Sequence, residues 1–159
     1  MYFTLYQSPL GEIALTANDK GLTALAFQDG SAAIDLEAGY QESSAPFVEA
    51  CRQLDEYFAG ERDEFSLALA PKGTEFQKKV WQALTTIKQG ETKSYQWLAK
   101  KINNEKAVRA VGSANGANPI ALIIPCHRVI GANGKLTGYA GGLNLKAKLL
   151  MHEGAKFKV

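Results

Sequence analysis

The sequence predicts an α+β protein, in which a small antiparallel sheet with one helix precedes a mainly helical half. Apolar side chains alternate or cluster in three short segments, residues 2–7, 12–17 and 22–27, as they do in β-strands. Later in the chain the apolar residues recur at helical spacing instead. The charge changes as well. Residues 1–70 hold 3 basic and 12 acidic side chains, a balance of −9, whereas residues 71–159 hold 15 and 4, a balance of +11. We therefore expect two domains, 1–70 and 71–159.

The first domain is expected to be a three-stranded meander followed by a helix. Turn signals at residues 8–11 and 18–21 separate the strands, and the acidic segment 28–44 reads as a loop. A helix is expected between Ser44 and Gly60. Its apolar stripe, in which Cys51 is expected to be a core residue, consists of Phe47, Ala50, Cys51, Leu54, Tyr57 and Phe58. Residues 65–69 are expected to be a further strand or an extended lead into a linker at 70–73.

The second domain is expected to begin with a capped helix. Thr74 and Gln77 have the spacing of a capping box, and Gly90 is expected to end this helix. Its predicted buried face consists of Phe76, Val80, Trp81, Leu84 and Ile87. Ser94 is expected to cap a short helix that runs through Lys101.

A helix-turn-helix is predicted from the next segment. Asn103 and Asn104 interrupt the helical pattern, and a further helix is expected over residues 105–115. Small apolar residues (Ala107, Ala110, Val111 and Ala114) are expected on its buried face, and Lys106, Arg109 and Ser113 on its outer face. Two short helices with a basic outer face are typical of DNA-binding helix pairs, although many helical hairpins share the pattern. A last helix is expected over residues 145–153.

The segment that combines the most reactive side chains follows an uncharged apolar run, residues 120–124. Pro125 ends the run, and Cys126, His127 and Arg128 come directly after it. A nearby imidazole or guanidinium lowers the pKa of a thiol and favours the nucleophilic thiolate. Neighbours on an extended strand point to opposite faces, so cooperation between Cys126 and His127 would need a bend at Pro125 or a bridging water. The alternative is that Cys126 is a small buried apolar residue.

The rest of the composition favours a cytoplasmic protein without a cofactor. The first residues form neither a signal peptide nor a membrane-spanning segment, so no membrane contact is expected. The two cysteines lie far apart, and no Cys/His cluster has metal-ligand spacing. The basic second domain favours a polyanionic partner, and an electrostatic match between the two halves is the alternative.

Several motifs in residues 73–154 resemble one known family. They include Ser-Tyr at 94–95, Arg-Ala-Val-Gly at 109–112, Asn-Pro-Ile at 118–120, Ile-Pro-Cys-His-Arg-Val at 124–129 and Gly-Tyr-Ala-Gly-Gly at 138–142. On these residues the chain resembles the O6-alkylguanine-DNA alkyltransferases, the methylated-DNA–protein-cysteine methyltransferases, in their single-unit bacterial form. The resemblance implies a ribonuclease H-like first domain and a winged-helix-like DNA-binding domain that carries the active cysteine.

The resemblance also implies the reaction. An alkyl group on O6 of guanine, or on O4 of thymine, would pass irreversibly to Cys126, and each molecule would act once. His127 would be the base, acting through a water, and Glu153 would orient His127. The expected partner is double-stranded DNA containing O6-alkylguanine, bound by a monomer through its minor groove with the damaged nucleotide flipped out.

The remaining site residues come from the same resemblance. Arg109 would fill the space that the flipped nucleotide leaves, and Tyr95 would help to rotate it. Asn118 would hold the turn before the reactive strand, and Tyr139 would stack near the base. Backbone groups of Cys126, Val129 and Ala140 would read the base edge. The full set of substrate- or DNA-binding residues implied is Tyr95, Arg109, Asn118, Arg128, Val129, Tyr139 and Ala140, and no metal ligand is implied.

Two other functions fit the residues less well. A non-catalytic DNA-binding or damage-sensing module would not need Cys126. A cysteine enzyme that turns over would need an oxyanion site and a route for water.

Overall fold

The computed structural model describes residues 1–37, 39–139 and 142–158 and has the α+β fold that the sequence predicts. Strands β1 (Tyr2–Ser8), β2 (Gly11–Asn18) and β3 (Gly21–Phe27) form the expected antiparallel meander. A two-residue strand, β4 (Gln41–Glu42), adds a parallel edge beside β1, so the sheet order is β3-β2-β1-β4. The sheet is therefore mixed at one edge, where the acidic segment 28–44 was expected to be a loop that could include a helical turn.

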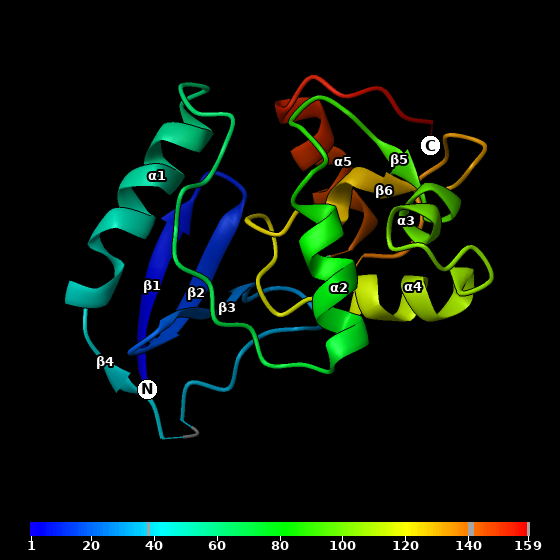
Figure 1. The fold of residues 1–159 in the computed structure, drawn as a ribbon. Helices are drawn as coiled ribbons and strands as arrows, with labels where there is room; N and C mark the ends of the chain where they lie inside the picture. The colour runs from blue at the N-terminus through cyan, green and yellow to red at the C-terminus, as the bar shows by residue number, and fades with distance from the viewer. Residues whose placement is uncertain (38, 140–141, 159) are drawn as a thin grey trace.

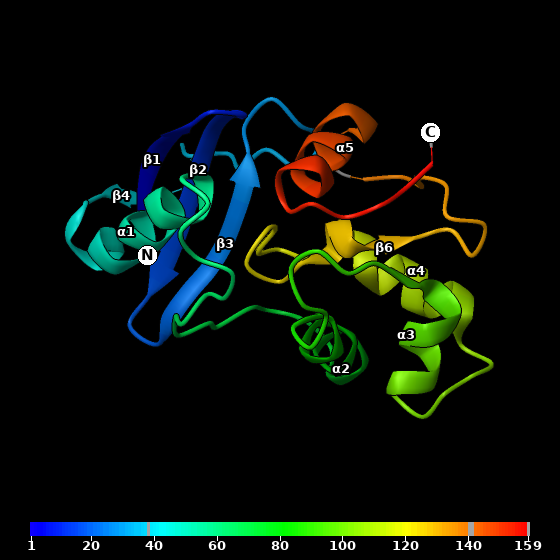
Figure 2. The same ribbon diagram turned by 90° about the horizontal axis from the view of Figure 1, so that it is seen from above.

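Helix α1 (Val48–Phe58) follows a short 3₁₀ turn, Ala45–Phe47, and lies on one side of the sheet (Figures 1 and 2). Phe47, Leu54 and Tyr57 are fully buried there. Cys51, which was expected in the core, is only half-buried and packs at the margin of the core. The apolar stripe of this helix is wider than the surface that the sheet can cover.

Helix α2 (Glu75–Leu84) begins as predicted. The Gln77 backbone N–H donates to Thr74 Oγ1 over 3.1 Å, and the Thr74 N–H donates to Gln77 Oε1 over 3.0 Å. The helix ends at Leu84 rather than near Gly90, and the chain continues as a turn that places Ile87 in the core. A local cap is therefore predicted well, whereas the helix end depends on what the following turn packs against.

The next two helices form the expected pair. The Ser94 side chain caps α3 (Tyr95–Lys101), and α4 (Val108–Gly116) begins three residues later than predicted. Arg109 is exposed as expected, but Ala110 is exposed too, and Asn115 takes a buried position beside Ala114. The prediction for Ala110 was wrong because alanine carries too little apolar surface to fix which face of a helix is buried.

The two halves of the chain share one hydrophobic core and a sheet edge. The free edge of β3 pairs at one end with the segment that leads into the linker, where the Leu22 N–H donates to the Ala68 carbonyl over 3.0 Å. At its other end the Leu25 N–H donates to the Pro119 carbonyl over 2.9 Å. Strands β5 (Lys93–Ser94) and β6 (Val129–Ile130) pair in parallel, and α5 (Leu143–His152) follows them. In Figure 2, α2 to α5 lie beyond β3, on the opposite side from α1. Within the described residues, no helix is long and apolar enough to cross a membrane.

Candidate active site

The segment that carries the cysteine is a tight turn and not a strand. Residues Cys126–Arg128 form a 3₁₀ helix, in which the Arg128 N–H donates to the Pro125 carbonyl over 3.0 Å. The expectation of a reactive strand was therefore wrong. Three residues per turn send the side chains of Cys126, His127 and Arg128 in different directions within the interior, where all three are buried.

Glu153, the residue that caps α5, connects the other two side chains of this turn. His127 Nε2 lies 2.8 Å from Glu153 Oε2. Arg128 donates from Nε to Oε1 over 2.9 Å and from Nη2 to Oε2 over 3.1 Å, and its Nη1 donates to the Ile87 carbonyl over 2.7 Å. The Glu153 carboxylate is thus held by a bidentate guanidinium fork, which is a strong and directional pairing.

The protonation states follow from these contacts. Burial opposes the charge on Glu153, but the hydrogen bonds from His127 and Arg128 prevail and lower its pKa to about 2. Burial lowers the pKa of His127 below its usual value, against the opposing effect of Glu153, so this imidazole is neutral near pH 7. An ionised carboxylate only accepts, so His127 Nε2 carries the proton. His127 Nδ1 is then a free lone pair; it is buried and bonds to no described residue.

The thiol of Cys126 lies at a cavity of about 450 Å³ between the two halves. Burial raises the pKa of Cys126 above its usual value, although the Asn118 side chain and Lys146 oppose this. The lowered pKa that the neighbouring residues suggested is therefore not what the structure shows. The main physical reason is the burial of the thiol; in addition, Arg128 is paired with Glu153 and His127 is uncharged, so neither supplies a free positive charge. Without substrate, Cys126 is therefore a thiol, and the next residue, His127, is a neutral base.

Two asparagines brace the turn. Asn118 Nδ2 donates to the Ile124 carbonyl over 2.7 Å, and its Oδ1 accepts from the Ile120 N–H over 3.0 Å. Asn118 therefore closes the chain reversal before Cys126, as expected. Asn115, on α4, also lines the cavity, and its Nδ2 lies 3.5 Å from the Cys126 carbonyl.

A second polar chain runs along the other side of the turn. Tyr95 Oη lies 2.6 Å from Thr137 Oγ1. Lys146 Nζ donates to the Val129 carbonyl over 2.7 Å and to the Thr137 carbonyl over 3.2 Å. Lys146 is completely buried, and burial lowers its pKa to about 8. Backbone groups of Val129 were expected to read a base edge, and its carbonyl already accepts this bond.

The structure brings most of the predicted site residues together. Tyr139 lines the cavity with Cys126, and its hydroxyl is buried without a partner among the described residues. Ala140 lies outside the described residues. Arg109 lies on the exposed face of α4. Arg128 is the clear departure: its guanidinium is engaged with Glu153 and Ile87 in the interior, so it does not face a DNA surface.

Sequence reasoning missed two residues of the site. Lys146 stands on the apolar stripe of α5, one turn before Leu149 and Leu150, and a lysine at such a position is a usable signal. Tyr57 donates from Oη to Glu153 Oε2 over 2.6 Å, and it comes from α1 in the other half of the chain. Nothing near Tyr57 in the sequence indicates a partner 96 residues away. In the described part of the chain, no group of three His, Cys, Asp or Glu side chains could hold a metal ion.

Comparisons with known proteins identify relatives of both halves of the chain. Residues 75–155 match the family described as 6-O-methylguanine DNA methyltransferase, DNA binding domain, and residues 1–71 match its ribonuclease-like domain. A methylated-DNA–protein-cysteine methyltransferase of Methanosarcina acetivorans is 54% identical over 98% of this chain and 99% of its own length. One of Mycolicibacterium paratuberculosis is 50% identical over 92% of this chain and 88% of its own.

A solved structure extends the likeness to the whole fold. The crystal structure of Mycobacterium tuberculosis OGT in complex with DNA superposes with a TM-score of 0.90 at 45% identity, covering 97% of this chain and 93% of that one. The family models together match both halves of the chain, and the Methanosarcina acetivorans relative is 54% identical over almost all of it. The chain therefore belongs to the 6-O-methylguanine DNA methyltransferase family.

Proposed function

We propose that the protein repairs DNA by transferring the alkyl group of O6-alkylguanine directly and irreversibly to Cys126. The observation that carries this is the 2.8 Å contact of His127 Nε2 with Glu153 Oε2, which leaves the buried His127 Nδ1 without a partner among the described residues. A buried thiol with a raised pKa needs such a base to become a nucleophile. The nucleophile–base–carboxylate order is that of other nucleophilic sites.

The bonds balance without a cofactor. The Cys126 sulfur forms a bond to the alkyl carbon while the bond from that carbon to guanine O6 breaks. The thiol proton passes through a bridging water to His127 Nδ1, the leaving guanine takes up a proton from solvent, and His127 returns its own proton to solvent. The product is a thioether, which water does not hydrolyse as it does an acyl-enzyme, so each molecule acts once. O4-alkylthymine offers the same alkyl–oxygen bond and is the second expected substrate.

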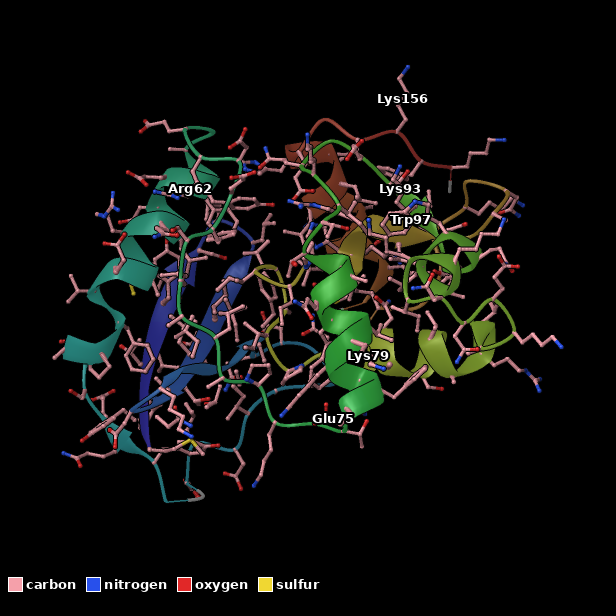
Figure 3. The ribbon with its side chains drawn as sticks, in the orientation of Figure 1. Arg62, Glu75, Lys79, Lys93, Trp97 and Lys156 are labelled. Carbon is pink, nitrogen blue, oxygen red and sulfur yellow. The ribbon has the colours of Figure 1, made fainter. Side chains whose placement is uncertain are left out.

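The proposed DNA surface belongs to the second half of the chain. A stacked base cannot present its alkyl carbon to Cys126, so the nucleotide must leave the duplex. Arg109 on exposed α4 is the proposed residue that fills the gap, with the helix in the minor groove. Basic side chains such as Lys79, Lys93 and Lys156 lie on this half in Figure 3 and would serve the phosphates. We propose domain 1–70 as the support of the site and domain 71–159 as the DNA-binding and reactive unit of a monomer.

The test is to incubate the protein with excess duplex DNA carrying labelled O6-methylguanine and to analyse tryptic peptides. We expect one methyl group per active molecule, on the peptide of residues 110–128, which contains Cys126 and no internal Lys or Arg. The peptide that contains Cys51 should carry none. Repair beyond one lesion per molecule would instead indicate a cysteine enzyme that turns over. Binding without any transfer would indicate a damage-sensing module. Both cysteines are free thiols, which suits a reducing compartment such as the cytoplasm.

A further inference from the structure

Tyr57 reaches the site from the other half of the chain. It is the last residue but one of α1, only 1% exposed, and its hydroxyl donates to Glu153 Oε2 over 2.6 Å. The same oxygen faces His127 Nε2 at 2.8 Å. The phenol and the imidazole therefore share one acceptor atom, and a change in either hydrogen bond acts on the other.

The phenol is fixed in place at both ends. His152, the residue before Glu153, donates from Nε2 to the Tyr57 backbone carbonyl over 2.8 Å. The ring of Tyr57 meets the ring of Phe58 edge-on, with centroids 5.0 Å apart, and lies 5.5 Å from that of Phe65. Because the ring is packed on several sides, its hydroxyl cannot follow the carboxylate if that group moves. The Tyr57 hydrogen bond therefore holds the Glu153 carboxylate in one position.

We propose that Tyr57 is a positioning residue for the transfer reaction, which holds the Glu153 carboxylate so that His127 keeps Nδ1 free for the proton of Cys126. The inference rests on the proposed function. Arg128 binds both oxygens of Glu153 and would draw the carboxylate toward itself. The fork sets the plane of the carboxylate relative to the guanidinium, but the two groups can still shift together, away from His127. The Tyr57 hydrogen bond to Oε2 opposes this shift on the side of His127.

The same bond affects the basicity of His127. A hydrogen bond donated to Oε2 disperses the negative charge of that oxygen and weakens its attraction for an imidazolium. Without the hydroxyl, Glu153 favours the charged form of His127 more strongly, and the pKa of His127 rises. More of the imidazole then carries a proton on Nδ1 near neutral pH and cannot act as a base. Burial and the adjacent Glu153 carboxylate raise the pKa of Tyr57 above its usual value, so the phenol remains a donor throughout.

The test compares Tyr57→Phe with Tyr6→Phe. Tyr6 Oη donates to Asp55 Oδ1 over 2.5 Å, so the control loses the same kind of phenol–carboxylate bond in the same half, away from the site. The first readout is the rate of transfer from free O6-benzylguanine. The second is the rate of alkylation of Cys126 by iodoacetamide, followed by peptide mass spectrometry between pH 5 and 9. The second readout requires no repair activity.

For Tyr57→Phe we expect both rates at pH 7 to fall roughly tenfold, part of the ~10²–10⁴-fold that a positioned general base supplies. The acidic limb of the pH–rate curve should move to higher pH. Tyr6→Phe should follow the wild type. A purely structural role would lower the active fraction but leave the limb in place, and that outcome overturns the proposal. Should the Phe variant not fold, Tyr57→Met also lacks the donor and gives the same comparison. A wild type whose thiol responds to pH as described but accepts no alkyl group from DNA would refute the proposed function alone.

Discussion

Glu153 accepts four hydrogen bonds, from His127, Tyr57 and two nitrogens of Arg128. The bonds from His127 and Arg128 keep its carboxylate ionised in spite of burial. The guanidinium balances the carboxylate, so neither charge acts at long range on the thiol. Burial keeps His127 neutral near pH 7 against the opposing effect of Glu153, and a neutral imidazole is the form that can take a proton. The reactivity of this thiol therefore depends on the base and not on a lowered thiol pKa.

Arg128→Met tests whether Arg128 acts in the interior. The change leaves a buried carboxylate without its guanidinium, and breaking such a pair costs about 3–5 kcal/mol of unfolding free energy. Denaturant unfolding measures this loss. The affinity of the folded variant for undamaged duplex should remain within about twofold, because the side chain does not reach the surface. A salt slope of DNA binding reduced by about 1 would instead identify Arg128 as a phosphate contact.

Acid stability tests the charge of Glu153. Its pKa is about 2 in the folded protein and about 4.5 in the unfolded chain. A lowered folded pKa stabilises the protein above the unfolded value, and that stability is lost as the pH falls from about 4.5 toward 2. A shift of this size corresponds to a loss on the order of 3 kcal/mol.

The measurement is the unfolding free energy of the wild type and Glu153→Gln over this pH range. The difference between the two proteins should shrink as the pH falls. Glu105→Gln, which removes an exposed acid in the same half, is the control and should parallel the wild type. A constant difference between wild type and Glu153→Gln would mean that Glu153 is not ionised through a depressed pKa.

At the scale of elements, local signals were predicted well and long-range ones were not. The capping box of α2 and the Ser94 cap of α3 depend on residues three positions apart, which a sequence displays directly. The turn at 126–128 depends on where the chain must go after Pro125, and an apolar run alone does not distinguish a strand from a turn. The hydrogen bond of Tyr57 to Glu153 depends on how α1 and α5 pack together, which no local sequence pattern indicates.

Arg109 on helix α4 is expected to matter for duplex DNA but not for a free base. Arg109→Ala should impair repair of duplex DNA by about tenfold or more, because flipping costs a few kcal/mol that the side chain helps to offset. Transfer from free O6-benzylguanine should be almost unchanged, since a free base is never unstacked. Lys79→Ala, which removes an exposed charge from α2, controls for general loss of DNA affinity. An equal loss on both substrates would assign Arg109 to the chemistry or to the fold.

Across the whole molecule, the two halves are joined tightly but differ in charge. The edge of β3 is bonded to both the linker and the segment before Cys126, and Tyr57 reaches Glu153 across the boundary. These bonds attach the segment before the reactive turn to the edge of the sheet. The charge balance nevertheless remains −9 over residues 1–70 and +11 over residues 71–159. The acidic half repels a polyanion, and the basic half attracts it, so the molecule has a preferred orientation toward DNA.

The salt dependence of DNA affinity tests that orientation. If about five phosphates are neutralised, the logarithm of the affinity should fall with that of the salt concentration with a slope of about −4.5, because each contact releases about 0.9 counterion. Lys106→Gln, on the basic half before α4, should lower the magnitude of the slope by about 1. Lys20→Gln removes an equally exposed lysine from the acidic half and should leave the slope unchanged, because that surface would face away from the duplex. Equal effects of the two changes would mean that both halves approach DNA, which would contradict an orientation set by the segregated charges.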